Sequence, residues 1–214
     1  LSRLLENLKL PEDRSRYRTR RELRGRPREA VLSHLGAWVD SLDPGAPRYE
    51  HHLLEGLWVT WGLNAVNPTI LRRLLGAEDF RVRAAAVKVL RYAMHQIKDG
   101  QDLLRVATRD GHGRVRLEAI AAASWLPANE ALPLIESAAE EAVDEWIQPV
   151  LETSVASLRG KEIQSAFSAQ VVEPDSGLRG EEREWFILGA EVYRREGHCA
   201  TCHQENGRGL PAAQ

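Results

Sequence analysis

The chain has 214 residues, of which 43% are hydrophobic and 28% are charged, so it can bury a sizeable core in one or two globular domains. Its formal net charge of -2 provides no bulk positive field that would select nucleic acid or an anionic membrane. No apolar run reaches the roughly 18 residues of a membrane-spanning helix, so we expect no transmembrane segment in this chain.

The first 160 residues show consecutive amphipathic patterns. In residues 29–42, the apolar side chains recur at i, i+4, i+7 and i+11, which is one stripe of a helix. Residues 48–61 repeat this pattern with several leucines and tryptophans. Prolines and glycines separate the patterns, and no segment alternates apolar and polar residues for long enough to indicate a strand. We therefore predict an all-α fold for this region.

The sequence repeats itself at an offset of 33 residues. Residues 70–72 (Ile-Leu-Arg) match residues 103–105 (Leu-Leu-Arg), and Arg-Val-Arg occurs at both 81–83 and 114–116. A period of this size, spanning two short helices, is typical of an α-solenoid. One helix pair cannot bury its apolar face alone, so neighbouring pairs stack side by side.

The repeated residues have assignable roles. We expect Asp79 to cap a helix, and Arg83 and Arg116 to lie between repeats, where they bond a carboxylate or the carbonyl end of a neighbouring helix. In the helix that begins after Asp79, four apolar residues are expected to face the core, namely Val82, Ala86, Val87 and Leu90.

Residues 79–86 match the pattern Asp-x-x-x-Arg-x-x-Ala with Val before the Arg, which resembles the second helix of HEAT repeats. The second copy has His112 in place of the aspartate. This resemblance implies an α-α superhelix, a HEAT/armadillo-like solenoid, over residues 1–160. At the roughly 40 residues of such a repeat, four or five helix pairs are expected there.

The composition changes after residue 160. Residues 161–180 are rich in Gln, Ser, Pro and Gly, and we interpret them as a linker. A new helix is expected to begin near Glu181, because three glutamates there favour a helix amino end. Residues 181–214 then form a separate segment.

Both cysteines of the chain lie in the motif Cys199-Ala-Thr-Cys202-His203. This C-x-x-C-H spacing is that of a c-type haem attachment site, so Cys199 and Cys202 are predicted to bind haem c covalently, with His203 as an axial ligand of the iron. A zinc site would need four ligands, and a thioredoxin-like motif would need a βαβ context. A plain disulfide between the two cysteines is the remaining alternative.

Residues 181–214 resemble the start of a class I cytochrome c domain. Gly189 and Tyr193 match the Gly-x-x-x-aromatic pattern of its first helix, and residues 204–211 resemble the loop after the proximal histidine. The resemblance also implies a distal methionine and a closing helix, and neither is present. The only methionine, Met94, is predicted to pack in the solenoid. We therefore expect a truncated cytochrome segment in a fragment of a longer protein, with haem present in the full-length matured form.

The chain resembles PVC-type haem-binding proteins in four features taken together. These are its arginine-rich start, residues 47–58, the HEAT-like repeats and the C-x-x-C-H motif. That resemblance implies an exported or periplasmic redox protein, in which the HEAT scaffold positions a c-type haem for electron transfer from a dehydrogenase module. The implied partner is a β-propeller domain or another redox protein. No catalytic residues stand out in this chain. The alternative is a non-catalytic protein-protein interaction scaffold with the haem motif unloaded.

Several other residues have two interpretations. Residues 14–28 contain eight arginines, but acidic residues interrupt them and Tyr17 is their only aromatic, so we favour a solvated or protein-docking face over nucleic-acid binding. His51 and His52 are interpreted as facing the core or a carbonyl group rather than a metal, and His198 as a surface residue. All six tryptophans are predicted to pack the solenoid, namely Trp38, Trp58, Trp61, Trp125, Trp146 and Trp185.

Overall fold

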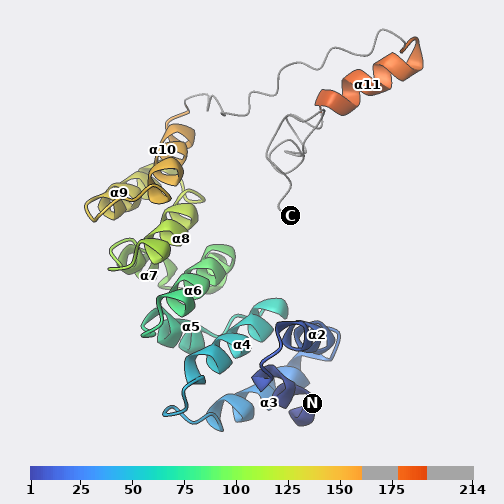
Figure 1. Cartoon of the computed structure of the whole chain (residues 1–214), viewed down its shortest axis with the longest axis vertical. Coiled ribbons are helices and arrows are strands. Elements are labelled where there is room, and N and C mark those ends of the chain that lie inside the picture. Colours follow the sequence, from blue (N-terminus) through green and yellow to red (C-terminus); the bar gives the residue numbers. More distant parts are fainter. Residues whose placement is uncertain (161–177, 192–214) are drawn as a thin grey trace. The chain divides into compact units, whose positions relative to one another are not determined.

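The computed structural model describes residues 1–160 and 178–191, and every regular element in these two ranges is a helix (Figure 1). The chain divides into two units, residues 1–161 and residues 162–214, each described by itself. In the second unit the described helix is α11 (Glu181–Glu191), which begins at the predicted residue and has three glutamates in its first turn. Most of the predicted linker lies outside the described residues.

The first unit is built from successive helix pairs. α1 (Ser2–Glu6) and the short 3₁₀ helix η1 (Asn7–Lys9) pack against α2 (Asp13–Arg24). The next pairs are α3 (Arg28–Asp40) with α4 (Tyr49–Gly62), α5 (Pro68–Leu75) with α6 (Phe80–Ala93), α7 (Gly100–Ala107) with α8 (Gly113–Ala123), and α9 (Ala128–Ala139) with α10 (Ile147–Leu158). A 3₁₀ turn, η2 (Met94–Gln96), follows α6.

The second helices of the pairs form a continuous layer. α2, α4, α6, α8 and α10 each contact the next one in this order, as Figure 1 shows for the successive pairs. Residues 1–160 thus contain five stacked pairs, in agreement with the predicted four or five. Side chains that lie at equivalent positions of successive second helices can therefore form one surface across the repeats.

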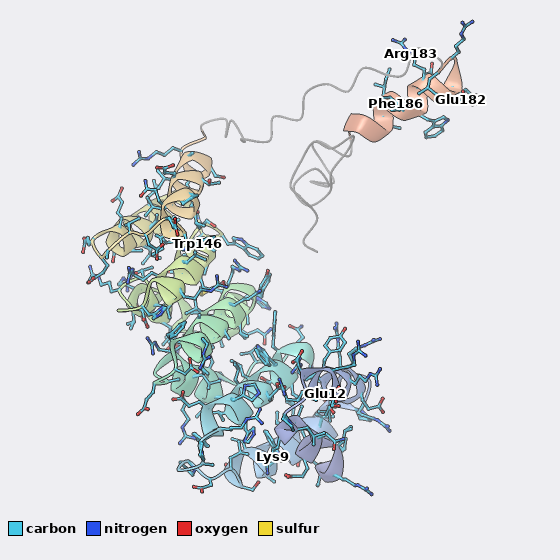
Figure 2. The ribbon with its side chains drawn as sticks, in the orientation of Figure 1. Lys9, Glu12, Trp146, Glu182, Arg183 and Phe186 are labelled. Atoms are coloured by element: carbon cyan, nitrogen blue, oxygen red, sulfur yellow. The ribbon has the colours of Figure 1, made fainter. Side chains whose placement is uncertain are left out.

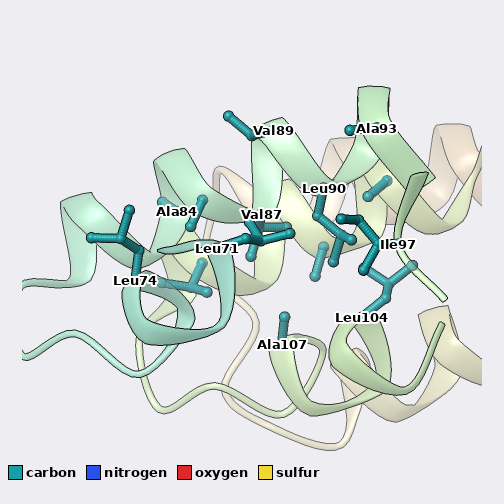
Figure 3. Packing of buried hydrophobic residues seen from close by; sticks show 14 of the residues in the cluster. Leu71, Leu74, Ala84, Val87, Val89, Leu90, Ala93, Ile97, Leu104 and Ala107 are labelled. Carbon is teal, nitrogen blue, oxygen red and sulfur yellow. The ribbon is translucent and has the colours of Figure 1, made fainter. Parts of the chain in front are cut away.

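The core runs between the two helices of each pair and on into the next pair. Figure 3 shows Leu71, Val87, Leu90, Ile97 and Leu104, from α5, α6 and the segment through α7, packed around one interior. Each of these side chains is at most 4% exposed, and burying one stabilises the fold by about 1.5–3 kcal/mol. The four residues predicted to face the core are all buried, namely Val82, Ala86, Val87 and Leu90.

The predicted cap at Asp79 is confirmed, and the second copy replaces it with a different acceptor. The Asp79 carboxylate accepts a hydrogen bond from the backbone N–H of Arg81 at 2.8 Å. At the equivalent place before α8, the Nδ1 of His112 accepts from the backbone N–H of Arg114 at 3.1 Å. A neutral imidazole can therefore satisfy the free amide at the helix start as the carboxylate does.

The predicted inter-repeat arginines are also confirmed. Arg83 donates to both carboxylate oxygens of Asp110 in the next repeat, at 2.7 and 2.9 Å. Arg116 donates to the backbone oxygen of Asp110 at 2.7 Å and to that of Ala142 in the following repeat. Burial, the largest single influence, would raise the pKa of Asp110, but the hydrogen bonds from Arg83 and from the backbone N–H of His112, with the nearby positive charge, together hold the pKa below its usual value.

Arg16 in α2 is a third arginine of this kind, which the comparison at an offset of 33 missed. It donates to the backbone oxygens of Leu10 and Pro11, six and five residues earlier, as Arg83 does to those of its own preceding loop. At 7% exposure Arg16 is buried, so the prediction of a solvated arginine face is wrong for this residue. An acidic residue four positions before the arginine is the sequence signal that Arg16 shares with Arg83, with Glu12 in place of Asp79, whereas Arg116 has His112 at that position.

Candidate docking surface on the second helices

A row of aromatic rings crosses the layer of second helices. Trp61 of α4 stacks on Tyr92 of α6, with ring centroids 5.5 Å apart and planes inclined at 28°. Tyr92 meets Trp125, just after α8, edge to face at 5.1 Å and 86°. The positions 61, 92 and 125 differ by 31 and 33, close to the sequence period. The helical repeat therefore builds the row, and each ring contact holds its neighbour in place.

Guanidinium groups lie over two rings of this row and over Trp58, one helical turn before Trp61. Arg20 lies 5.0 Å from the ring centroid of Trp58, and Arg91 lies 4.8 Å from that of Tyr92 and 5.5 Å from that of Trp125. Such cation–π contacts contribute about 0.5–2 kcal/mol each, depending on exposure. Positive charge is thus fixed along the aromatic row.

A groove of about 670 Å³ opens at the α2 end of this row. Its lining contains Tyr17, Arg21, Arg24 and Trp61 but no carboxylate. We call the groove and row together the arginine–aromatic strip, which comprises Tyr17, Arg20, Arg21, Arg24, Trp58, Trp61, Arg91, Tyr92 and Trp125. Tyr17 is 51% exposed and Trp125 is 61% exposed, so the strip is open to a partner.

A buried ion cluster beneath the strip holds α2 against α4. The Glu55 side chain is fully buried, and one of its oxygens accepts from Arg16 Nε at 2.9 Å. The other oxygen accepts from Arg20, the residue that lies over Trp58. Because Glu55 fixes the guanidinium of Arg20, it positions one end of the strip.

His51 of α4 faces this cluster, and its ring meets that of the adjacent His52 edge to face. His51 Nε2 lies 3.7 Å from Glu55 Oε1, and His51 and His52 are each partly buried. Burial lowers the pKa of both imidazoles, and nearby arginines lower it further: Arg16 and Arg48 at His51, and Arg48 at His52. Among the described residues, no group of three or more metal-ligating side chains includes either histidine.

These lowered pKa values predict acid sensitivity. The unfolded chain takes up protons at the ordinary histidine pKa of about 6.5, whereas the folded chain resists protonation, so stability is lost as pH falls below this value. When the pH falls from 7.5 to 5.5, we expect the free energy of unfolding to decrease by less in the variant His51→Gln/His52→Gln than in the unchanged chain. Urea unfolding at several pH values measures this. An identical pH dependence in both proteins would contradict the prediction.

A second groove, of about 1140 Å³, lies near the start of α4 and α6. Its charged groups join neighbouring repeats: the Glu50 carboxylate accepts from the backbone N–H groups of Glu78 and Asp79, at 2.7 and 3.1 Å. Asp79 also pairs with Arg81, which holds the pKa of its carboxyl below the usual value. Glu50, Asp79 and Arg81 of this groove therefore have partners within the fold.

The predicted haem-binding residues Cys199, Cys202 and His203 lie outside the described residues, as do His198 and the remainder of the cytochrome-like segment after residue 191. Met94 packs against the core cluster, as predicted, and a Cβ at Gly100 would lie 2.4 Å from its sulfur. No helix within the described ranges is both long and apolar enough to cross a membrane.

The tryptophans do not all pack the solenoid. Trp38 is 5% exposed, and Trp58 and Trp61 are partly buried against the core. Trp125 and Trp146 are 61% and 71% exposed, so their predicted packing role is wrong; Trp146 stands at the start of α10 (Figure 2). Trp185 belongs to α11, outside the solenoid unit, where it is also exposed. Helical spacing alone does not distinguish a buried ring from an exposed one at a helix end.

The comparisons with known proteins concern the solenoid. Residues 67–156, from the start of α5 into α10, match a family model described as HEAT repeats. A search of curated proteins gives no match to the chain. The predicted resemblance is confirmed for this region: the stacked helix pairs of residues 67–156 are similar to HEAT repeats in sequence as well as in arrangement.

Proposed function

We propose that this chain is a protein-docking scaffold whose docking surface is the arginine–aromatic strip. HEAT repeats suggest a protein-interaction scaffold, because stacked repeats present an extended surface to partners. The observation that carries the proposal is the row of Trp61, Tyr92 and Trp125, in which Tyr92 and Trp125 are exposed and Arg91 lies over both of these rings. Trp, Tyr and Arg are the residues that dominate the binding energy of protein interfaces.

Trp61, Tyr92, Trp125 and Arg91 of the strip are already held by one another. Binding then costs less side-chain entropy than it would with free rotamers, at about 0.5–1.5 kcal/mol for each side chain that must be immobilised. A rigid surface of this kind suits repeated docking to one partner.

Photo-cross-linking from the full chain in its source cells tests the docking proposal. A benzoylphenylalanine replacing Trp125 should cross-link a discrete partner protein. The same residue replacing Val106, which is 74% exposed on α7, is the matched control and should give no such product. Equal products from both positions, or none from Trp125, would contradict docking at the strip.

We further propose that the scaffold carries haem c on Cys199 and Cys202, with His203 as an iron ligand. Two thiols and an imidazole at this spacing are the donor set that a c-type haem requires. Bound haem would supply one-electron transfer. The sequence resemblances favour an exported protein that receives electrons from a dehydrogenase module, with a β-propeller domain as the candidate donor. Covalent haem on the matured chain is the measurement that tests this.

A further inference from the structure

We infer that the arginine–aromatic strip binds an extended acidic segment of its partner, an inference that rests on the proposed docking function. The groove that begins the strip is lined by three arginines and three aromatic residues, with no acidic side chain. Its ligand should therefore bring negative charge together with apolar side chains.

The charge of the strip is incompletely neutralised. Arg20 is paired with the buried Glu55, but within residues 1–160 and 178–188 no ion pair involves Arg21, Arg24 or Arg91. The Nε of Arg91 is buried without an acceptor in these residues, and its Nη2 donates only to the hydroxyl of Tyr92. Guanidinium groups bind carboxylates through two parallel hydrogen bonds, so a carboxylate is the partner that completes the exposed Arg21 and Arg24.

The length of the strip indicates the length of its ligand. It crosses four neighbouring helices, α2, α4, α6 and α8, whose axes in packed helices lie about 10 Å apart. The resulting span of about 30 Å matches about nine residues of extended chain at about 3.3 Å each. Every second side chain of an extended segment faces the same way, so such a segment can present about four or five side chains to the strip, carboxylates and apolar groups among them.

The ring contacts favour an acidic peptide over single-stranded nucleic acid. Nucleic acid binds such surfaces by stacking bases on free aromatic faces. Here Trp61 and Tyr92 stack on each other, and Arg20 covers a face of Trp58.

Fluorescence anisotropy with the full chain tests this inference. The probe is a labelled nine-residue peptide in which two phenylalanines are spaced by glutamates, compared with the same peptide carrying glutamines. We expect the glutamine peptide to bind at least about tenfold more weakly, because charge complementarity contributes to both capture and retention. The variant Arg21→Glu/Arg24→Glu should weaken binding of the acidic peptide by a similar factor. Both arginines are exposed, so the fold should be retained.

The matched control is Arg105→Glu/Arg159→Glu, which makes the same charge change on exposed residues of α7 and of the end of α10, outside the groove and the strip. It should weaken binding by less than about twofold at 0.15 M salt, where charges beyond about 8 Å are largely screened. Four results would each overturn the inference. They are an equal loss of affinity in both variants, equal binding of the glutamine and glutamate peptides, no binding of the acidic peptide, and tighter binding of a nine-nucleotide DNA strand. If the Trp125 cross-link persists without peptide binding, docking stands and only its acidic specificity falls.

Discussion

The variant Glu55→Gln is expected to lower the free energy of unfolding by about 3 kcal/mol, because removing one member of a buried ion cluster leaves the other charges uncompensated. Glu55 is fully buried and accepts from both Arg16 and Arg20, which are themselves largely shielded from water. A neutral amide can accept a hydrogen bond, but it cannot offset two guanidinium charges.

Urea unfolding followed by circular dichroism measures this loss. Glu22→Gln, which breaks an exposed pair with Arg26, is the matched control and should leave the unfolding midpoint nearly unchanged. A second variant, Arg16→Met/Glu55→Met, should recover part of the loss, since an apolar pair of similar volume can replace a buried ion pair. A Glu55→Gln midpoint equal to that of Glu22→Gln would contradict the role given to this cluster.

The haem proposal predicts an all-or-none effect. The chain, exported into a periplasm that matures c-type cytochromes, should carry haem that survives denaturing electrophoresis and shows a Soret band. The variant Cys199→Ser/Cys202→Ser should lose both signals completely, because no thiol then remains to bind the haem vinyl groups.

Met94→Leu is the control for this experiment, because Met94 packs against the solenoid core and should have no part in attachment. It should retain full haem staining. An unchanged chain that gains no haem under these conditions, or a double serine variant that keeps it, would contradict the proposal. In the first case the docking scaffold would remain as the function, with the motif unloaded.

Much of the solenoid could be predicted from local patterns. The helices and the cap at Asp79 follow from periodicity and from side-chain chemistry within one or two turns of helix, and the inter-repeat arginines Arg83 and Arg116 follow from the sequence repeat. Arg16 could not be found in this way, because its copy lies outside the ungapped frame. The full burial of Glu55 was also missed, since its partners lie on α2, 39 and 35 residues earlier.

The candidate docking surface, too, could be predicted from the sequence only in part. The identities of Trp61, Tyr92 and Trp125 and their spacing near 33 residues are present in the sequence, as is the haem motif. The packing of the second helices side by side decides which rings face solvent and which stack on each other. That packing depends on the volumes of many core side chains together. The predicted packing role of Trp125 was wrong for this reason. Local chemistry is readable along the chain, whereas a surface shared by four helices exists only once the repeats have stacked.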